Sequence, residues 1–241
     1  MSAETFGFQA VSFGWRLLWR LFPPCCMGCG APGAEICEVC LRSAERPVGK
    51  TCGRCGKTLT GAGVCPLCSG LETIWFERVR SAFVYAGLIR EAIHAFKFER
   101  KLGLSFLFAD AIFSVYLEMK TRVDIVLPAP ISRARRAERG YNQSAWVART
   151  FSLKTGIPYS ATALQKTRDT AHQALLNEAA RRTNLSGVFE AEPGDIQGKS
   201  VLVVDDVLTT GTTMNECSRA LREAGAASVF GITIAATENR A

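Results

Sequence analysis

The second half of the chain alternates apolar runs with segments that are expected to be helical. Residues 124–130 and 200–206 contain continuous apolar runs, which are typical of strands buried on both faces of a sheet. Residues 88–98 and 143–155 are expected to form helices, as is the segment that follows residue 213. The apolar face of that last helix would consist of Met214, Cys217, Leu221 and Ala224, and Gly225 would end it. This alternation predicts an α/β fold in which helices cover both faces of a parallel sheet.

The amino-terminal segment, residues 6–22, is apolar enough to raise the question of a membrane span or a signal peptide. Its uncharged part, residues 5–15, is well short of the ~20 residues that cross a bilayer, and Arg16 and Arg20 follow it. A signal peptide carries its basic residues in front of the apolar part, which is the reverse of this order. We therefore expect residues 1–24 to contain an amphipathic helix that docks on the protein, a membrane-surface helix being the less favoured alternative. Its apolar face would consist of Val11, Trp15, Leu18, Trp19 and Phe22.

Nine of the ten cysteines lie between Cys25 and Cys68, and eight of these nine form four C-x-x-C pairs. A C-x-x-C turn directs two thiolates at one metal ion, and two such turns complete a tetrahedral zinc site. Residues 25–70 contain little other apolar sequence, so this segment needs metal to become ordered. We predict a small double zinc ribbon that holds two structural zinc ions. The expected ligands are Cys26, Cys29, Cys37, Cys40, Cys52, Cys55, Cys65 and Cys68.

Several alternatives remain open for the cysteines. Sequential pairing would build one site from the first two pairs and another from the last two, and interleaved pairing remains an alternative. Cys25 is an alternative to Cys26 as a ligand. Disulfides are the main alternative to zinc. Because no secretory signal is found, the reducing cytoplasm is the expected compartment, and it favours zinc.

Length and charge bound the domain organisation and the partners. With 241 residues, 48% of them hydrophobic, the chain can bury one sizeable core beside the cysteine module, and residues 71–241 are expected to form it. The formal net charge of +7 suggests a partner that carries phosphate. Eight thiolates bound to two zinc dications would lower this charge from +7 to +3. The charge alone is therefore a weak argument for nucleic acid.

The apolar run that ends at residue 204 leads into Asp205 and Asp206, and then into a glycine flanked by four threonines. Such a turn between a buried strand and a helix N-terminus can direct backbone N–H groups and hydroxyls at one phosphate. Two adjacent carboxylates need hydrogen-bond donors, which the vicinal hydroxyls of a ribose would supply. Helix capping is the simpler explanation, but it accounts for only one Asp and one Thr. The candidate phosphate-binding residues are Thr209, Thr210, Gly211, Thr212 and Thr213.

Residues 201–213 resemble the phosphoribosyl pyrophosphate-binding signature of type I phosphoribosyltransferases. The resemblance implies that Asp205 and Asp206 bind the ribose 2′ and 3′ hydroxyls while the threonines surround the 5-phosphate. Together with the cysteine pairs, residues 127–130 and 138–143 are similar to those of the ComF family. Its members carry a double zinc ribbon ahead of a phosphoribosyltransferase-type domain, and some are linked to competence for DNA uptake. The similarity extends to Lys97, Gln173, Arg181 and Asn184, whereas Ala180 replaces an acid that the family often has.

Arginines follow the strand that ends at Pro130, at the place where a pyrophosphate group would lie if the ribose is bound to Asp205. Guanidinium groups can bind such a group through paired hydrogen bonds. We expect Pro130 and Arg133 to belong to the binding site, a solvated basic face or a nucleic-acid patch being the alternative. The remaining arginines of this segment are Arg135, Arg136 and Arg139. Residues 166–182 are expected to form a mobile loop over the reacting centre or a disordered connector, and His94 and His172 are not expected to be catalytic.

These patterns favour an enzyme that binds phosphoribosyl pyrophosphate with Mg²⁺ and transfers ribose 5-phosphate to an acceptor, releasing pyrophosphate. Asp205 and Asp206 are the catalytic candidates, because cleavage builds positive charge on the sugar that carboxylates stabilise. Mg²⁺ and arginines would stabilise the negative charge on pyrophosphate. The alternative is a non-catalytic nucleic-acid-associated or adaptor protein that retains the phosphate site. Single-stranded DNA or competence proteins would then be its partners.

Overall fold

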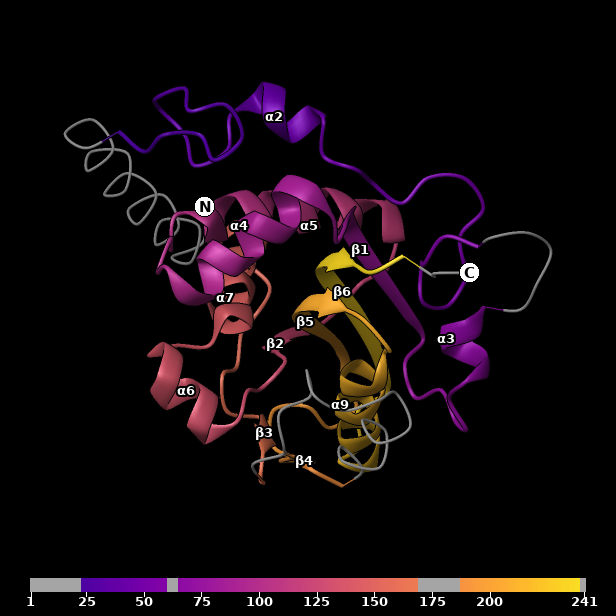
Figure 1. Cartoon of the computed structure of the whole chain (residues 1–241). Helices are drawn as coiled ribbons and strands as arrows, with labels where there is room; N and C mark the ends of the chain where they lie inside the picture. Colours follow the sequence, from indigo (N-terminus) through magenta and orange to yellow (C-terminus); the bar gives the residue numbers. More distant parts are fainter. Residues whose placement is uncertain (1–22, 60–64, 169–186, 239–241) are drawn as a thin grey trace.

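The computed structural model describes residues 23–59, 65–168 and 187–238 (Figure 1). The amphipathic helix expected within residues 1–24 lies outside the described residues, and so does most of the loop at residues 166–182. The same holds for His172, Gln173, Ala180, Arg181 and Asn184. Among the helices of the described ranges, none has the length and apolar character that crossing a membrane requires.

The fold is built on a sheet of four parallel strands in the order β1-β6-β5-β2 (Figure 1). These strands are β1 (Arg78–Val84), β2 (Ile125–Pro128), β5 (Ser200–Leu208) and β6 (Ser228–Ala236). The two apolar runs of the sequence are neighbours in it, since β2 pairs with β5. A separate antiparallel pair consists of β3 (Leu164–Lys166) and β4 (Phe189–Ala191). The predicted parallel sheet is thus confirmed.

Helices cover both faces of the sheet, as the continuous apolar runs predicted. One face packs against α4 (Gly87–Phe98), α5 (Leu104–Met119) and α7 (Gln143–Thr155), in what we call the α5 core. The opposite face packs against α9 (Thr212–Glu223), in the α9 core. Met214, Cys217 and Leu221 of α9 are all buried there, which confirms Cys217 as a core residue.

Strand β5 carries the two adjacent carboxylates in its interior. The sequence placed Asp205 and Asp206 at the strand's end, but β5 continues because its pairing with β6 extends to Leu208↔Ala236. Consecutive residues of a strand point to opposite faces of the sheet. Asp206 accordingly faces the α5-core side, where Leu202 and Val204 point, and Asp205 shares its parity with Val203 of the α9 core.

Two helix starts bring further polar side chains to this end of the sheet. Helix α7 begins after Asn142, whose side chain accepts hydrogen bonds from the backbone N–H groups of Ser144 and Ala145, at 3.0 and 3.4 Å. This cap fixes the first turn of α7, which contacts both β2 and β5. The short helix α6 (Arg133–Arg139) precedes it and is capped by Ser132.

The cysteine-rich segments pack on opposite faces of the sheet. Residues around α2 (Glu38–Arg42) contribute Ile36 and Leu41 to the α5 core, and Figure 1 shows α2 above α4 and α5. At α3 (Pro66–Ser69), Leu67 and the preceding Cys65 belong to the α9 core, as do Cys52 and Cys55. Because both segments share cores with the sheet, each is held by packing as well as by its cysteines.

Candidate ligand-binding cleft and metal centres

A cleft of about 220 Å³ opens where the parallel strands end. Its walls include Tyr85, which follows β1, and Pro130, which follows β2. Asp205 and Asp206 of β5 face it, as do Thr209 and Thr213. In open parallel sheets, ligands bind at the carboxyl ends of the strands. The structure therefore brings most of the residues singled out from the sequence to one cavity, at the edge where a ligand is expected.

Each of the two carboxylates is anchored through one of its oxygens. Oδ1 of Asp205 accepts hydrogen bonds from the Ser144 hydroxyl, at 3.2 Å, and from the backbone N–H of Asp206, at 2.8 Å. Oδ2 of Asp206 accepts a hydrogen bond from Nε2 of Gln143, at 2.6 Å. The same oxygen forms an ion pair with Nζ of Lys97, at 2.7 Å. Among the described residues, all hydrogen bonds given by side chains to these carboxylates end on those two atoms. The two residues line the cleft, and Oδ2 of Asp205 and Oδ1 of Asp206 accept no side-chain hydrogen bond from the described residues.

The surroundings push the pKa values of the two carboxyl groups apart. Burial, together with the adjacent charge of Asp206, raises the pKa of Asp205 to about 7. Burial also opposes the charge of Asp206, but Lys97 and Gln143 outweigh it and hold the pKa of Asp206 below its usual value. At neutral pH the site therefore contains one firmly ionised carboxylate and one that titrates.

The raised pKa of Asp205 predicts that this residue destabilises the unliganded protein at high pH. The folded chain binds the proton of Asp205 more tightly than the unfolded chain, whose aspartates have a pKa of about 3.9, so the free energy of unfolding should fall between pH ~4 and pH ~7. Asp205→Asn removes that decline, and each pKa unit corresponds to about 1.4 kcal/mol. We expect the variant to be more stable than the wild type at pH 8 by at least about 1 kcal/mol, and closer to it at pH 5. Urea unfolding at both pH values measures this. The exposed Asp195, changed to Asn, is the control, and an Asp205→Asn variant that is less stable at pH 8 contradicts the prediction.

The threonine loop, residues 209–213, turns the chain from β5 into α9. Gly211 lies at the N-cap of α9 with φ +71°, a left-handed conformation that glycine adopts without strain. A Cβ atom at this position would lie only 2.8 Å from Cδ2 of Leu67, so close packing also requires the glycine. The hydroxyls of Thr210 and Thr212 are 3.0 Å apart. The loop brings Thr209 and Thr213 to the cleft at the N-terminus of α9, whereas Thr210, Gly211 and Thr212 are not among its lining residues.

The arginines of α6 divide into two sets. Arg135 and Arg139 line the cleft, whereas Arg133 and Arg136 are exposed and are not among its lining residues. The Arg139 guanidinium lies 4.9 Å from the centre of the Phe98 ring. Its Nε atom is buried and has no hydrogen-bond partner among the described residues. Of the arginines considered from the sequence, the structure thus brings Arg135 and Arg139 to the cleft together with Pro130.

Two of the residues that organise the site were given no role from the sequence. Lys97 enters the sequence argument only through the similarity to the ComF family, and Gln143 only as the last residue of the segment 138–143. The signal for Lys97 is its spacing: Ile89 and Ile93 are buried on α4, and Lys97 follows them at the same four-residue interval. A charged residue that continues a buried stripe has to meet a partner. By contrast His94 is exposed and stacks near Phe98, with ring centres 4.7 Å apart, in line with a surface role.

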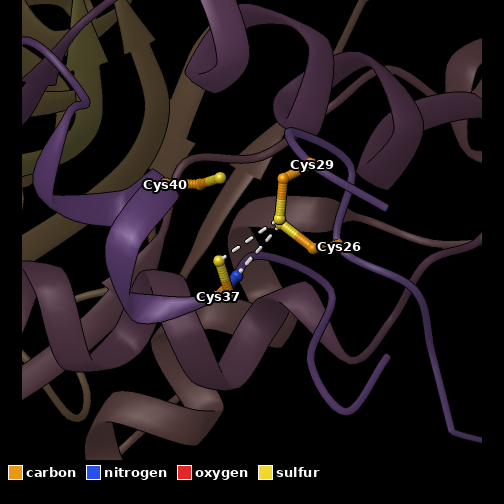
Figure 2. Close-up of side chains that lie close together, drawn as sticks. All are labelled: Cys26, Cys29, Cys37 and Cys40. Atoms are coloured by element: carbon orange, nitrogen blue, oxygen red, sulfur yellow. Dashed lines mark hydrogen bonds between the residues drawn. The ribbon is translucent and has the colours of Figure 1, made fainter. Parts of the chain in front are cut away.

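The first cysteine cluster combines the first and second C-x-x-C pairs of the chain (Figure 2). Its sulfur atoms all lie within 4.8 Å of one another, and those of Cys29 and Cys37 are 3.7 Å apart. The backbone N–H of Cys37 donates to Sγ of Cys26 at 3.2 Å, which lowers the pKa of Cys26 to about 6. The exposed Cys25 is not part of the cluster. The members are Cys26, Cys29, Cys37 and Cys40.

The second cysteine cluster also consists of two successive C-x-x-C pairs, but three of its four cysteines are buried. Sγ of Cys52 lies 3.7 Å from that of Cys68, and Sγ of Cys55 lies 3.4 Å from that of Cys65. Burial raises the pKa of Cys68 to about 12, so a nearby cation is needed if all four are to be thiolates. A tetrahedral zinc ion with Zn–S bonds of about 2.3 Å separates its sulfurs by about 3.8 Å, close to the 3.4–3.7 Å between the sulfur pairs given above. Sequential pairing, with Cys26 in place of Cys25, is the arrangement that the structure contains.

Comparison with known proteins agrees with this geometry. Residues 125–240 match the model of the phosphoribosyl transferase domain. The chain is 31% identical to DNA utilization protein YhgH of Escherichia coli O157:H7, over 86% of this chain and 94% of that protein. It is 25% identical to competence protein ComFC of Bacillus subtilis, over 91% of this chain and 88% of the relative. Competence protein F of Haemophilus influenzae is 29% identical, over 72% and 79% of the two chains.

Proposed function

This chain belongs to the ComF family of phosphoribosyltransferase-type proteins, and we propose that it binds phosphoribosyl pyrophosphate with Mg²⁺ and transfers ribose 5-phosphate to an acceptor. Pyrophosphate is the leaving group. The observation that carries the proposal is the pair of carboxylates that line the cleft next to Thr209 and Thr213, each with one oxygen held by side chains of the protein. That arrangement suits a ligand in which two vicinal hydroxyls lie near a phosphate.

The sugar would be bound by the two carboxylates. One ribose hydroxyl would donate to Oδ2 of Asp205 and the other to Oδ1 of Asp206, while Ser144 and Lys97 keep the opposite oxygens in place. Hydrogen bonds to ionised acceptors are the stronger ones, and they orient the anomeric carbon. The same negative charges stabilise the positive charge that develops on the sugar as the bond to pyrophosphate breaks.

The phosphate groups would occupy the two ends of the cleft. Backbone N–H groups and hydroxyls of the threonine loop would donate to the 5-phosphate at the N-terminus of α9. Arg135 and Arg139 would donate to the pyrophosphate, and the unpartnered Nε of Arg139 is available for such a bond. Carboxylate oxygens are ligands that Mg²⁺ accepts, so Asp205 and Asp206 fit it together with the phosphates of the ligand. When bound, Mg²⁺ would neutralise charge on the departing pyrophosphate.

Thermal unfolding in the presence of Mg²⁺ and phosphoribosyl pyrophosphate tests the proposal. A ligand at a hundred times its Kd stabilises the folded state by about 2.7 kcal/mol, which gives a clear rise in Tm. The rise should be absent in Asp205→Asn/Asp206→Asn and preserved in the surface control Asp195→Asn. Release of pyrophosphate in the presence of an amine or base acceptor would then establish the transfer. A wild-type protein whose Tm does not respond to the ligand would disprove the proposal.

A second candidate function is binding of single-stranded DNA. The names of the relatives refer to DNA utilization and competence, and Arg133 and Arg136 are exposed basic residues of α6 that do not line the cleft. Binding through phosphates weakens steeply as salt rises. Arg133→Ala/Arg136→Ala should then reduce both the affinity and the salt dependence without changing the response to phosphoribosyl pyrophosphate. For either function the zinc thiolates call for a reducing compartment, and we place the protein in the cytoplasm.

A further inference from the structure

A buried lysine connects the second cysteine cluster to the threonine loop. Lys57, two residues after the ligand Cys55, donates from Nζ to the backbone carbonyl of Thr209 at 2.7 Å and to the hydroxyl of Thr237 at 3.0 Å. The residue is only 6% exposed. A buried ammonium group is unfavourable unless hydrogen bonds compensate it, and these two bonds contribute to that compensation.

The backbone of Lys57 belongs to the cysteine cluster itself. Its carbonyl accepts a hydrogen bond from the N–H of Cys52, at 2.9 Å, and its N–H donates to the sulfur of Cys55, where it opposes the rise in pKa that burial causes. Gly56 precedes it in a left-handed conformation, with φ +72°. The geometry of the metal-binding turn therefore sets the direction in which the Lys57 side chain leaves it.

A second contact joins the same two parts. Leu67 lies between the ligands Cys65 and Cys68, is buried, and packs so closely on Gly211 that a Cβ atom there would be 2.8 Å away. The cluster thus supports the loop at Thr209 through a hydrogen bond and at Gly211 through packing. Thr209 itself lines the cleft, and the bond to Lys57 is made by its backbone carbonyl.

The contact with Lys57 changes the electrostatics of the threonine loop. When the carbonyl of Thr209 accepts a bond from an ammonium group, the peptide that joins Thr209 to Thr210 is polarised, and its N–H becomes a stronger donor. The positive charge also lies in a region of low dielectric constant, close to where an anion would bind. Both effects favour a phosphate over a neutral ligand.

We propose that Lys57 is a positioning residue for the threonine loop, through which the metal-binding turn of the second cysteine cluster sets the affinity for a sugar phosphate. The inference rests on the proposed function, because it concerns the same site. It assigns to the zinc ribbon a part in ligand binding in addition to its structural one.

The test compares two probes on the full chain loaded with zinc. Ribose 5-phosphate engages the threonine loop, whereas pyrophosphate with Mg²⁺ engages the arginine end of the cleft. In Lys57→Met, calorimetry should show at least a tenfold loss of affinity for ribose 5-phosphate and an unchanged affinity for pyrophosphate, with two zinc ions retained. Lys57→Arg should recover part of the loss. The exposed Lys50 of the same ribbon, changed to Met, is the matched control and should behave as the wild type.

The outcomes separate this inference from the function on which it rests. If the wild type and Lys57→Met bind ribose 5-phosphate with equal affinity, the inference is overturned and the proposed function is not. The same holds if Lys57→Met loses affinity equally for both probes, which a merely structural role would produce. A wild type that binds neither probe overturns the proposed function and the inference with it. If Lys57→Met fails to retain zinc, Lys57→Gln takes its place: loss of ribose 5-phosphate binding with zinc retained supports the inference, and full binding overturns it.

Discussion

Cys55→Ser should remove one of two bound zinc ions and should destabilise the protein more than any single change in the first cysteine cluster. Cys55 is completely buried, and its cluster forms part of the α9 core together with Phe76 and Val79. Binding of a structural zinc ion contributes about 10–16 kcal/mol in isolated zinc-finger peptides, and this energy becomes folding energy. We expect the loss of several kcal/mol and a marked fall in Tm. Metal analysis and thermal unfolding of the purified variant measure both effects.

Cys29→Ser is the comparison within the first cysteine cluster. Cys29 is exposed, and only Cys26 of that cluster is buried, so the same loss of one zinc ion should lower Tm less. Cys25→Ser should retain both zinc ions, because Cys25 lies outside the cluster. The prediction is refuted if Cys55→Ser still holds two zinc ions, or if its Tm falls no further than that of Cys29→Ser.

The parts of the fold that can be predicted from the sequence are those that depend on residues close together along the chain. The strand β5 follows from a continuous apolar run, and the cysteine clusters follow from C-x-x-C spacing, since both ligands of a pair lie in one turn. The loop between β5 and α9 follows from its glycine and threonines. The spacing leaves open which pairs combine, and the structure resolves it because the sulfur atoms of sequential pairs lie within 4.8 Å of one another.

The parts that the sequence does not predict depend on contacts between distant segments. Lys57 and Thr209 are separated by 152 positions, and no periodicity connects them. The two cysteine clusters lie on opposite faces of the sheet, although they are adjacent along the chain. Similarly the division of the α6 arginines, with Arg135 at the cleft and Arg133 outside it, depends on how the helix is rotated against the sheet. Composition alone treats them as equivalent.

Lys97→Met should destabilise the unliganded protein by about 3–5 kcal/mol at pH 8, because it leaves a buried carboxylate without its cation. The side chains of Lys97 and Asp206 are only 18% and 12% exposed, so water replaces little of the lost interaction. Gln143 still donates to Asp206, but a neutral amide stabilises the charge less than an ammonium group does. Urea unfolding of the wild type and the variant gives the difference.

The pH dependence distinguishes this mechanism from a loss of packing. In the wild type the pKa of Asp206 is held below its unfolded value, so the pair contributes stability above pH ~4 and loses it at more acidic pH. Without Lys97, burial dominates and raises the folded pKa of Asp206, so the variant should gain stability as the pH falls from 8 towards 5. The gap to the wild type should therefore narrow over that range. A gap that stays constant with pH would show that the aliphatic part of Lys97, and not its charge, stabilises the fold.

A double variant completes the cycle. Lys97→Met/Asp206→Asn contains neither charge, and the neutral amide can still pair with Gln143, so most of the lost stability should return. Asp206→Asn alone should have a smaller effect than Lys97→Met, because the flexible ammonium group can turn towards the open cleft and water. A double variant less stable than Lys97→Met would contradict the coupling. Recovery would identify the ion pair with Lys97 as the interaction that keeps Asp206 ionised and oriented before a ligand binds.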